Sequence, residues 1–72
     1  MYTSEIRKRR VAMGLTIFDV TLRSGVREAH LGAIENQRTV AYPKQRKQIA
    51  EFYGVSENEL FDAKGFAKEV AE

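Results

Sequence analysis

The sequence predicts a small all-α domain, and three observations favour this fold class. No stretch of strand length alternates apolar and polar residues. Helix-starting residues and helix-ending glycines occur at short intervals along the chain. The 72 residues include no cysteine, so neither a disulfide framework nor a Cys-based zinc site stabilises the fold. We therefore expect one domain of five short helices over residues 4–61, built on an economical hydrophobic core and followed by a tail over residues 62–72.

Each expected helix has its own start or stop signal. The five helices are placed at residues 4–13, 17–24, 28–35, 44–53 and 56–61. Thr16 with Asp19, and Ser56 with Glu59, have the spacing of a capping box, in which the two side chains satisfy free amides of the first turn. Pro43 is typical of a helix start. Glycines follow the first, second and fourth helices, where a left-handed residue commonly ends a helix.

The two ends of the chain give weaker signals. Thr3 or Ser4 is expected to cap the first helix. Phe66 and Val70 are four residues apart, which allows a short, frayed sixth helix in the tail. The N-terminus lacks the apolar core of a signal peptide, and the apolar stretches are far shorter than the ~20 residues that cross a membrane. We therefore expect a cytoplasmic protein with no membrane partner.

Charge is distributed unevenly around a net value of +2. Basic residues cluster at 7–10 and 44–47, whereas residues 28–35 contain no lysine or arginine. Basic clusters suit nucleic acid or an acidic partner, although four basic residues on a helix also form an ordinary solvated face. The sequence offers no cysteine nucleophile, metal-binding cluster, glycine-rich phosphate loop or catalytic dyad. We therefore expect no enzyme activity, no cofactor and no metal.

The segment over residues 17–36 carries the strongest functional signal. Its two short helices are joined through Gly25, Val26 and Arg27, as in a helix-turn-helix, in which a glycine takes the turn. The apolar residues that would hold the two helices together are Val20, Val26, Leu31 and Ile34.

From these residues the chain resembles the lambda-repressor/Cro-like (XRE-type) helix-turn-helix family over roughly residues 6–61. The segments that carry the resemblance are 10–16 (RVAMGLT), 25–26 (GV), 34–36 (IEN), 54–56 (GVS) and 59–61 (ELF). The resemblance implies a five-helix DNA-binding domain in which residues 28–35 form the recognition helix. It also implies a structural ion pair between Arg10 and Glu35.

The resemblance further implies which residues contact DNA, and this sequence departs from it at the base-reading positions. Recognition helices use arginine, lysine, glutamine or asparagine to read base edges. The corresponding residues here are Glu28, Ala29, Gly32 and Ala33. Ile17 replaces a phosphate-contacting glutamine at a position expected to be exposed, and Arg27 replaces a capping serine or threonine. The candidate phosphate contacts that remain are Thr16, Asn36, Arg38 and Lys44.

Two functions follow, both within the transcriptional control of a phage-type lysis–lysogeny switch. In the first, the chain resembles the small modulators of repression, or antirepressors, of temperate phages. Its helix-turn-helix surface then binds a partner repressor, and it binds double-stranded DNA weakly alone or within a complex. The residues of that surface are Ile17, Arg27, Glu28, Ala29, Gly32 and Ala33. In the second, the chain is a Cro-type operator-binding repressor, for which a homodimer through the fifth helix or the tail is allowed. The apolar and acidic reading positions favour the first.

Overall fold

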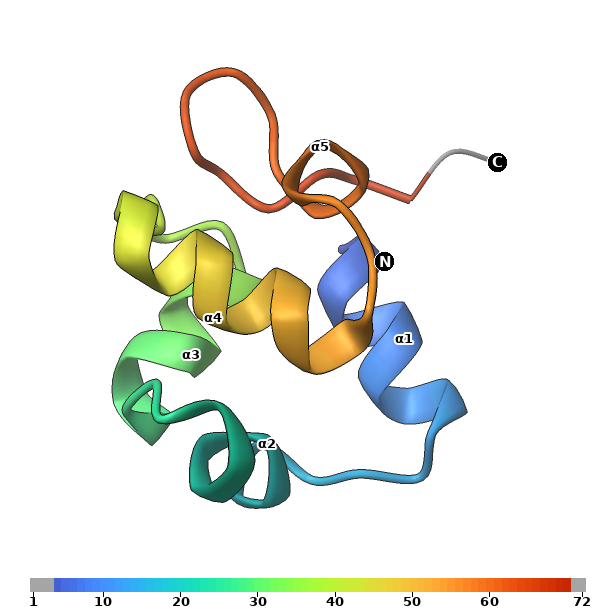
Figure 1. The fold of residues 1–72 in the computed structure, drawn as a ribbon. Coiled ribbons are helices and arrows are strands. Elements are labelled where there is room, and N and C mark those ends of the chain that lie inside the picture. Colours follow the sequence, from blue (N-terminus) through green and yellow to red (C-terminus); the bar gives the residue numbers. More distant parts are fainter. Residues whose placement is uncertain (1–3, 71–72) are drawn as a thin grey trace.

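The computed structural model describes residues 4–70, and five helices account for most of them (Figure 1). They are α1 (Glu5–Ala12), α2 (Ile17–Ser24), α3 (Glu28–Glu35), α4 (Pro43–Tyr53) and α5 (Glu57–Leu60). Each agrees with its expected bounds to within one residue at either end. Two isolated β-bridges occur, but residues 4–70 contain no strand. The all-α prediction is confirmed.

Local capping explains why the helix starts were predictable. The Ser4 hydroxyl accepts a hydrogen bond from the Arg7 amide at 3.2 Å and caps α1. Thr16 and Asp19 form the expected reciprocal box, with distances of 2.9 and 3.1 Å. Thr3, the alternative cap of α1, lies outside the described residues. Because each of these bonds joins residues three apart, the sequence spacing alone was enough to place them.

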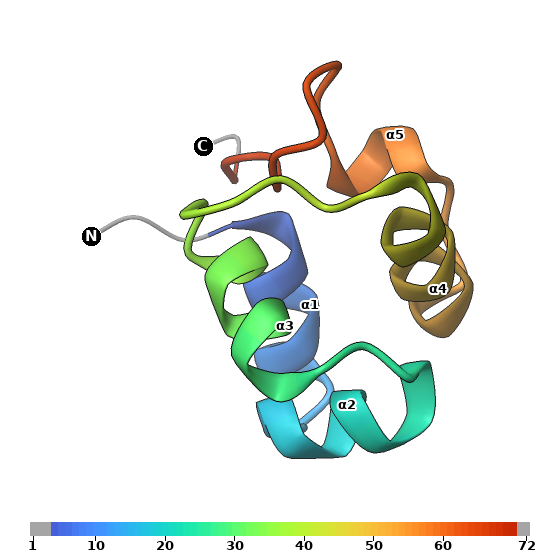
Figure 2. The same ribbon diagram turned by 90° about the vertical axis from the view of Figure 1, so that its left-hand side faces the viewer.

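The hydrophobic core draws on all five helices. Val20, Val26, Leu31 and Ile34 are buried as expected, with exposed fractions of 0–2%. The other buried apolar side chains are Ile6, Ala41, Ile49, Ala50, Leu60, Phe61 and Ala67. In both ribbon views α2 lies across one end of the domain, and the tail after α5 passes over the opposite end (Figures 1 and 2).

The tail does not form the sixth helix that its sequence allows. Over residues 62–70 it is a turn followed by an extended segment. The Asp62 carboxylate accepts hydrogen bonds from the amides of Lys64 and Phe66, at 2.9 and 3.0 Å. Gly65 then takes a left-handed conformation with φ of 95°. These side-chain bonds and this backbone angle direct the chain into a turn, so the spacing of Phe66 and Val70 was misleading.

Backbone hydrogen bonds join the tail to three other parts of the domain. The Glu5 amide donates to Lys68 O, the Lys68 amide to Leu60 O, and the Ala41 amide to Gly65 O, at 2.8, 2.8 and 2.9 Å. Ala67 is fully buried between these contacts. The described part of the tail is therefore packed as an integral part of the domain.

Helix length also bears on membrane topology. The longest helix, α4, has 11 residues. No helix within residues 4–70 has the length and apolar character that would let it span a bilayer.

Candidate functional site

The α2–α3 pair is held in place by the short connection between its helices. Gly25 ends α2 with φ of 83°, a conformation that glycine adopts without a steric penalty. Val26 follows and is 2% exposed, so it anchors the connection in the core. On α3, Leu31 and Ile34 face the core. These contacts fix which face of α3 remains outside.

The structure brings most of the predicted interface residues to one surface of the α2–α3 pair. Arg27, Glu28 and Ala29 are exposed, whereas Gly32 and Ala33 are half-buried. Glu28 occupies the first turn of α3, where its carboxylate interacts favourably with the helix dipole. The exposed start of α3 thus presents one basic, one acidic and one small side chain.

Ile17 differs from expectation. It is half-buried and packs against the core, rather than being exposed as the family position suggests. Its Cδ1 atom lies 3.8 Å from where a Cβ on Gly32 would be. The side chain of Ile17 therefore lies next to α3 at Gly32. An apolar residue at position 17 is explained by contact with α3.

This contact predicts that Gly32→Ala stabilises the domain. A Cβ at 3.8 Å makes an ordinary van der Waals contact, and alanine in a helix is favoured over glycine by about 0.5–1 kcal/mol. Gly65→Ala is the matched control, because its Cβ would lie 3.0 Å from Arg46 Nη1 and 3.1 Å from Ala41 O at a left-handed φ. Urea denaturation should show a higher free energy of unfolding for Gly32→Ala and a lower one for Gly65→Ala. Destabilisation by Gly32→Ala would contradict this packing.

Two further apolar side chains are exposed on α2. Phe18 and Leu22 are 55% and 68% exposed. They are four residues apart, so they lie on the same side of the helix, and we call them the α2 apolar stripe. Sequence reasoning missed this stripe. The signal was available, because the buried Val20 assigns the core to another face of α2 and leaves the stripe outside.

The candidate phosphate-contacting residues differ in whether their polar groups already form hydrogen bonds within the domain. Thr16 accepts from the Asp19 amide, and the Asn36 side chain donates to Gly32 O at 3.0 Å, so both polar groups already serve helix ends. The Thr16 amide also donates to Asp19, which lowers the pKa of that carboxyl. Arg38 and Lys44 are exposed. Thus the two basic candidates are placed best for contact with a polyanion.

The structure brings Arg10 and Glu35 together across the domain. Arg10 Nε donates to Glu35 Oε2 at 2.8 Å and its Nη2 to Oε1 at 3.1 Å, while Nη1 donates to Leu15 O at 2.9 Å. The two side chains are 12% and 2% exposed. The hydrogen bond from Arg10 to Glu35 raises the pKa of the guanidinium. Burial, and next the charge of Glu35, raise the pKa of Tyr53 to about 12. The pair therefore acts as architecture, joining α1 to α3.

The basic cluster of α1 is accordingly divided between two roles. Arg10 is committed to Glu35, and Arg9 lies 3.7 Å from Glu59 of α5. Arg7 and Lys8 are exposed. Arg10 therefore joins two helices, and Arg9 forms an exposed ion pair that contributes little to stability.

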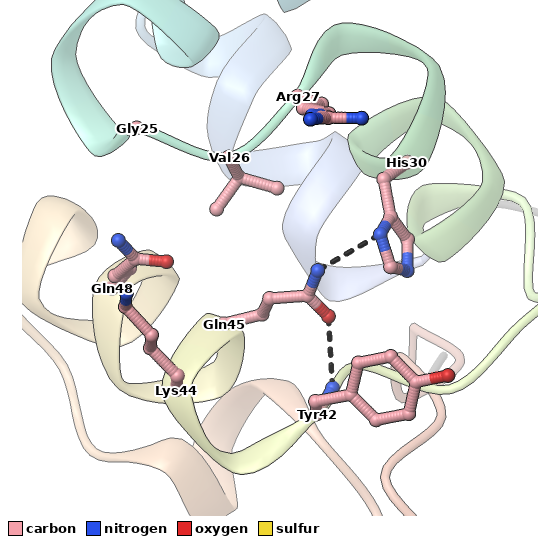
Figure 3. A pocket seen from close by; sticks show the side chains of 8 residues that line it. All are labelled: Gly25, Val26, Arg27, His30, Tyr42, Lys44, Gln45 and Gln48. Atoms are coloured by element: carbon pink, nitrogen blue, oxygen red, sulfur yellow. Dashed lines mark hydrogen bonds between the residues drawn. The ribbon is translucent and has the colours of Figure 1, made fainter.

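A cleft of about 370 Å³ separates the α2–α3 connection from the start of α4 (Figure 3). Gln45 crosses it, since its Nε2 lies 2.8 Å from His30 Nδ1 and its Oε1 accepts from the Tyr42 amide at 2.9 Å. The His30 and Tyr42 rings meet edge to face, with centroids 5.9 Å apart. These contacts join α3 to α4. The two contacts of His30 were not predictable from sequence spacing, because Tyr42 and Gln45 are 12 and 15 positions away from it.

No family model matches the chain, and no solved structure matches it. A segment of 56 residues is 38% identical to a protein described as trigger factor from Maricaulis maris (strain MCS10). The segment covers 75% of this chain but 11% of that protein. The similarity is therefore to a small part of the relative.

Proposed function

We propose that the protein is a helix-turn-helix regulator of the lambda-repressor/Cro-like type that acts by binding another protein, as an antirepressor or modulator. The observation that carries this proposal is the character of the α2–α3 surface. The α2 helix exposes the α2 apolar stripe, and the start of α3 carries Arg27, the acidic Glu28 and the small residues Ala29 and Ala33. Side chains of these kinds suit a protein surface better than the edges of bases.

Desolvation of the α2 apolar stripe favours binding to a protein. Phe18 and Leu22 expose more than half of their surface, and covering them releases water from apolar atoms. Glu28 would repel DNA phosphates but would attract the basic or amide-rich recognition helix of a repressor. A repressor held in this way has its own reading helix covered and cannot enter the major groove. The partner is thus the repressor of the same phage-type switch, and the complex would form in the host cytoplasm.

Binding to the repressor encoded beside this chain's gene tests the proposal. Leu22→Asp and Glu28→Lys are each expected to raise the dissociation constant more than tenfold, since each places the wrong character on the contact surface. Val11→Asp is the matched control, because Val11 is 58% exposed but lies on α1. Isothermal titration calorimetry with each folded variant measures the change. Retention of full affinity by both variants would remove this surface from the interaction.

A second candidate function, operator binding as a Cro-type repressor, is favoured by the exposed Arg38 and Lys44. If the protein binds DNA alone, replacing either residue by alanine should weaken binding equally on all sequences. The slope of log K against log salt should decrease in magnitude by about 1 for each lost phosphate contact. Fluorescence anisotropy with the native intergenic duplex and a scrambled duplex measures both effects. A loss confined to the native duplex would instead mean that these residues read bases.

A further inference from the structure

The cleft between the α2–α3 connection and α4 has the lining of an anion site. Its walls are Gly25, Val26, Arg27, His30, Tyr42, Lys44, Gln45 and Gln48. Two of these side chains are cationic and none is acidic. Its volume of about 370 Å³ falls in the lower part of the range for small-molecule sites.

The two cations come from opposite walls. Arg27 belongs to the connection before α3, and Lys44 belongs to the first turn of α4 (Figure 3). Glu28, the residue after Arg27, is not part of the lining. An anion between the walls would therefore be attracted from both sides without an opposing carboxylate in the lining.

The cleft also holds ordered polar groups around an apolar floor. Gln45 is fixed at both ends of its amide, by His30 Nδ1 and by the Tyr42 backbone. Because Gln45 Nε2 donates to Nδ1, the neutral His30 ring carries its proton on Nε2. Val26 closes the floor, and Gln48 supplies a further amide donor. Such preorganisation lowers the entropy cost of ligand binding.

From this lining we infer that the cleft binds a small phosphomonoester or free phosphate. A phosphomonoester carries about −1.5 to −2 charges at pH 7, which matches the two cations, whereas a carboxylate or a phosphodiester carries one. Arg27 offers paired donors to phosphate oxygens, and Lys44 supplies a compact charge. A phosphate bound here would link the start of α3 to α4. The lining shares no residue with the α2 apolar stripe and shares only Arg27 with the surface expected to bind the partner.

Titration of the ¹⁵N-labelled protein with inorganic phosphate, followed by NMR at pH 7.5, tests the inference. Amide shifts should saturate and concentrate at Arg27, His30 and Gln48. Dimethyl phosphate and acetate should bind at least fivefold more weakly, since each carries one charge. Lys44→Gln should weaken phosphate binding about tenfold. Lys8→Gln, the control, removes an exposed lysine on α1 and should leave phosphate binding unchanged.

Three results would overturn the inference. The first is equal affinity for phosphate and dimethyl phosphate, which would show that the cleft does not prefer a doubly charged anion. The second is an equal effect of Lys44→Gln and Lys8→Gln, which would indicate diffuse attraction to the surface. The third is a Lys44→Gln defect seen with a DNA duplex but not with free phosphate, which would assign the cleft to a nucleic-acid backbone. None of these results involves the repressor, so the proposed function is judged separately.

Discussion

Glu35→Ala is expected to lower the free energy of unfolding by about 3–5 kcal/mol, because it leaves the Arg10 guanidinium largely buried without its counter-charge. Glu35 accepts two hydrogen bonds from Arg10 and is 2% exposed. A domain of this length has a total stability of about 4–11 kcal/mol, so the loss removes a large part of it. Urea denaturation followed by circular dichroism measures the change.

A matched substitution separates burial from charge. Glu57→Ala breaks the ion pair with Arg46, whose atoms are 3.4 Å apart but whose side chains are 27% and 47% exposed. Exposed pairs contribute about 0–1 kcal/mol, so this variant should unfold close to the wild type. The double variant Arg10→Met, Glu35→Leu should recover most of the loss, because no charge is then buried. Equal losses from Glu35→Ala and Glu57→Ala would show that burial of the pair contributes nothing.

Most of the fold was predictable because its signals are local. The Thr16–Asp19 box and Gly25 act within a few residues of the helix ends that they define. Their geometry depends on spacing, which the sequence shows directly. The burial of Leu31 and Ile34 followed from the same logic, since helical spacing puts them on one face of α3.

The features that the sequence did not predict arise from contacts between residues far apart in the chain. Ile17 was expected to be exposed because the resemblance treats position 17 as a surface position. Its partial burial comes from contact with α3 near Gly32, fifteen residues away. The bridge from His30 to Gln45 also joins two helices, and each residue alone has an ordinary helical context. Local pattern cannot rank such pairings before the helices are placed.

The tail shows the same limit most clearly. Phe66 and Val70 have helical spacing, yet Asp62 and Gly65 form a turn and the following residues pair with Leu60 and Glu5. These backbone partners lie at the two ends of the helical region, so no window of the tail sequence contains them. The structure thus assigns to the tail a stabilising role that its sequence does not reveal.

That role predicts a large difference between two similar variants. Ala67→Glu should cost about 3–5 kcal/mol, because it places an unpaired carboxylate at a site that is fully buried. Ala63→Glu is the matched control, since Ala63 is exposed in the turn and should change stability by less than about 0.5 kcal/mol. Both unfolding midpoints are measured by circular dichroism in urea.

The comparison distinguishes the observed tail from a frayed helix. In a helix, residues 63 and 67 would occupy the same face one turn apart, and the two glutamates would have similar effects. In the structure, Ala67 is buried next to Lys68, whose backbone bonds to Leu60 and Glu5, whereas Ala63 is exposed in the turn. A large loss of stability in Ala67→Glu, without a similar loss in Ala63→Glu, would therefore show that the tail is packed against the core. Equal, small losses at both positions would mean that the tail contributes no core contact, and α5 would then have to hold its place without it.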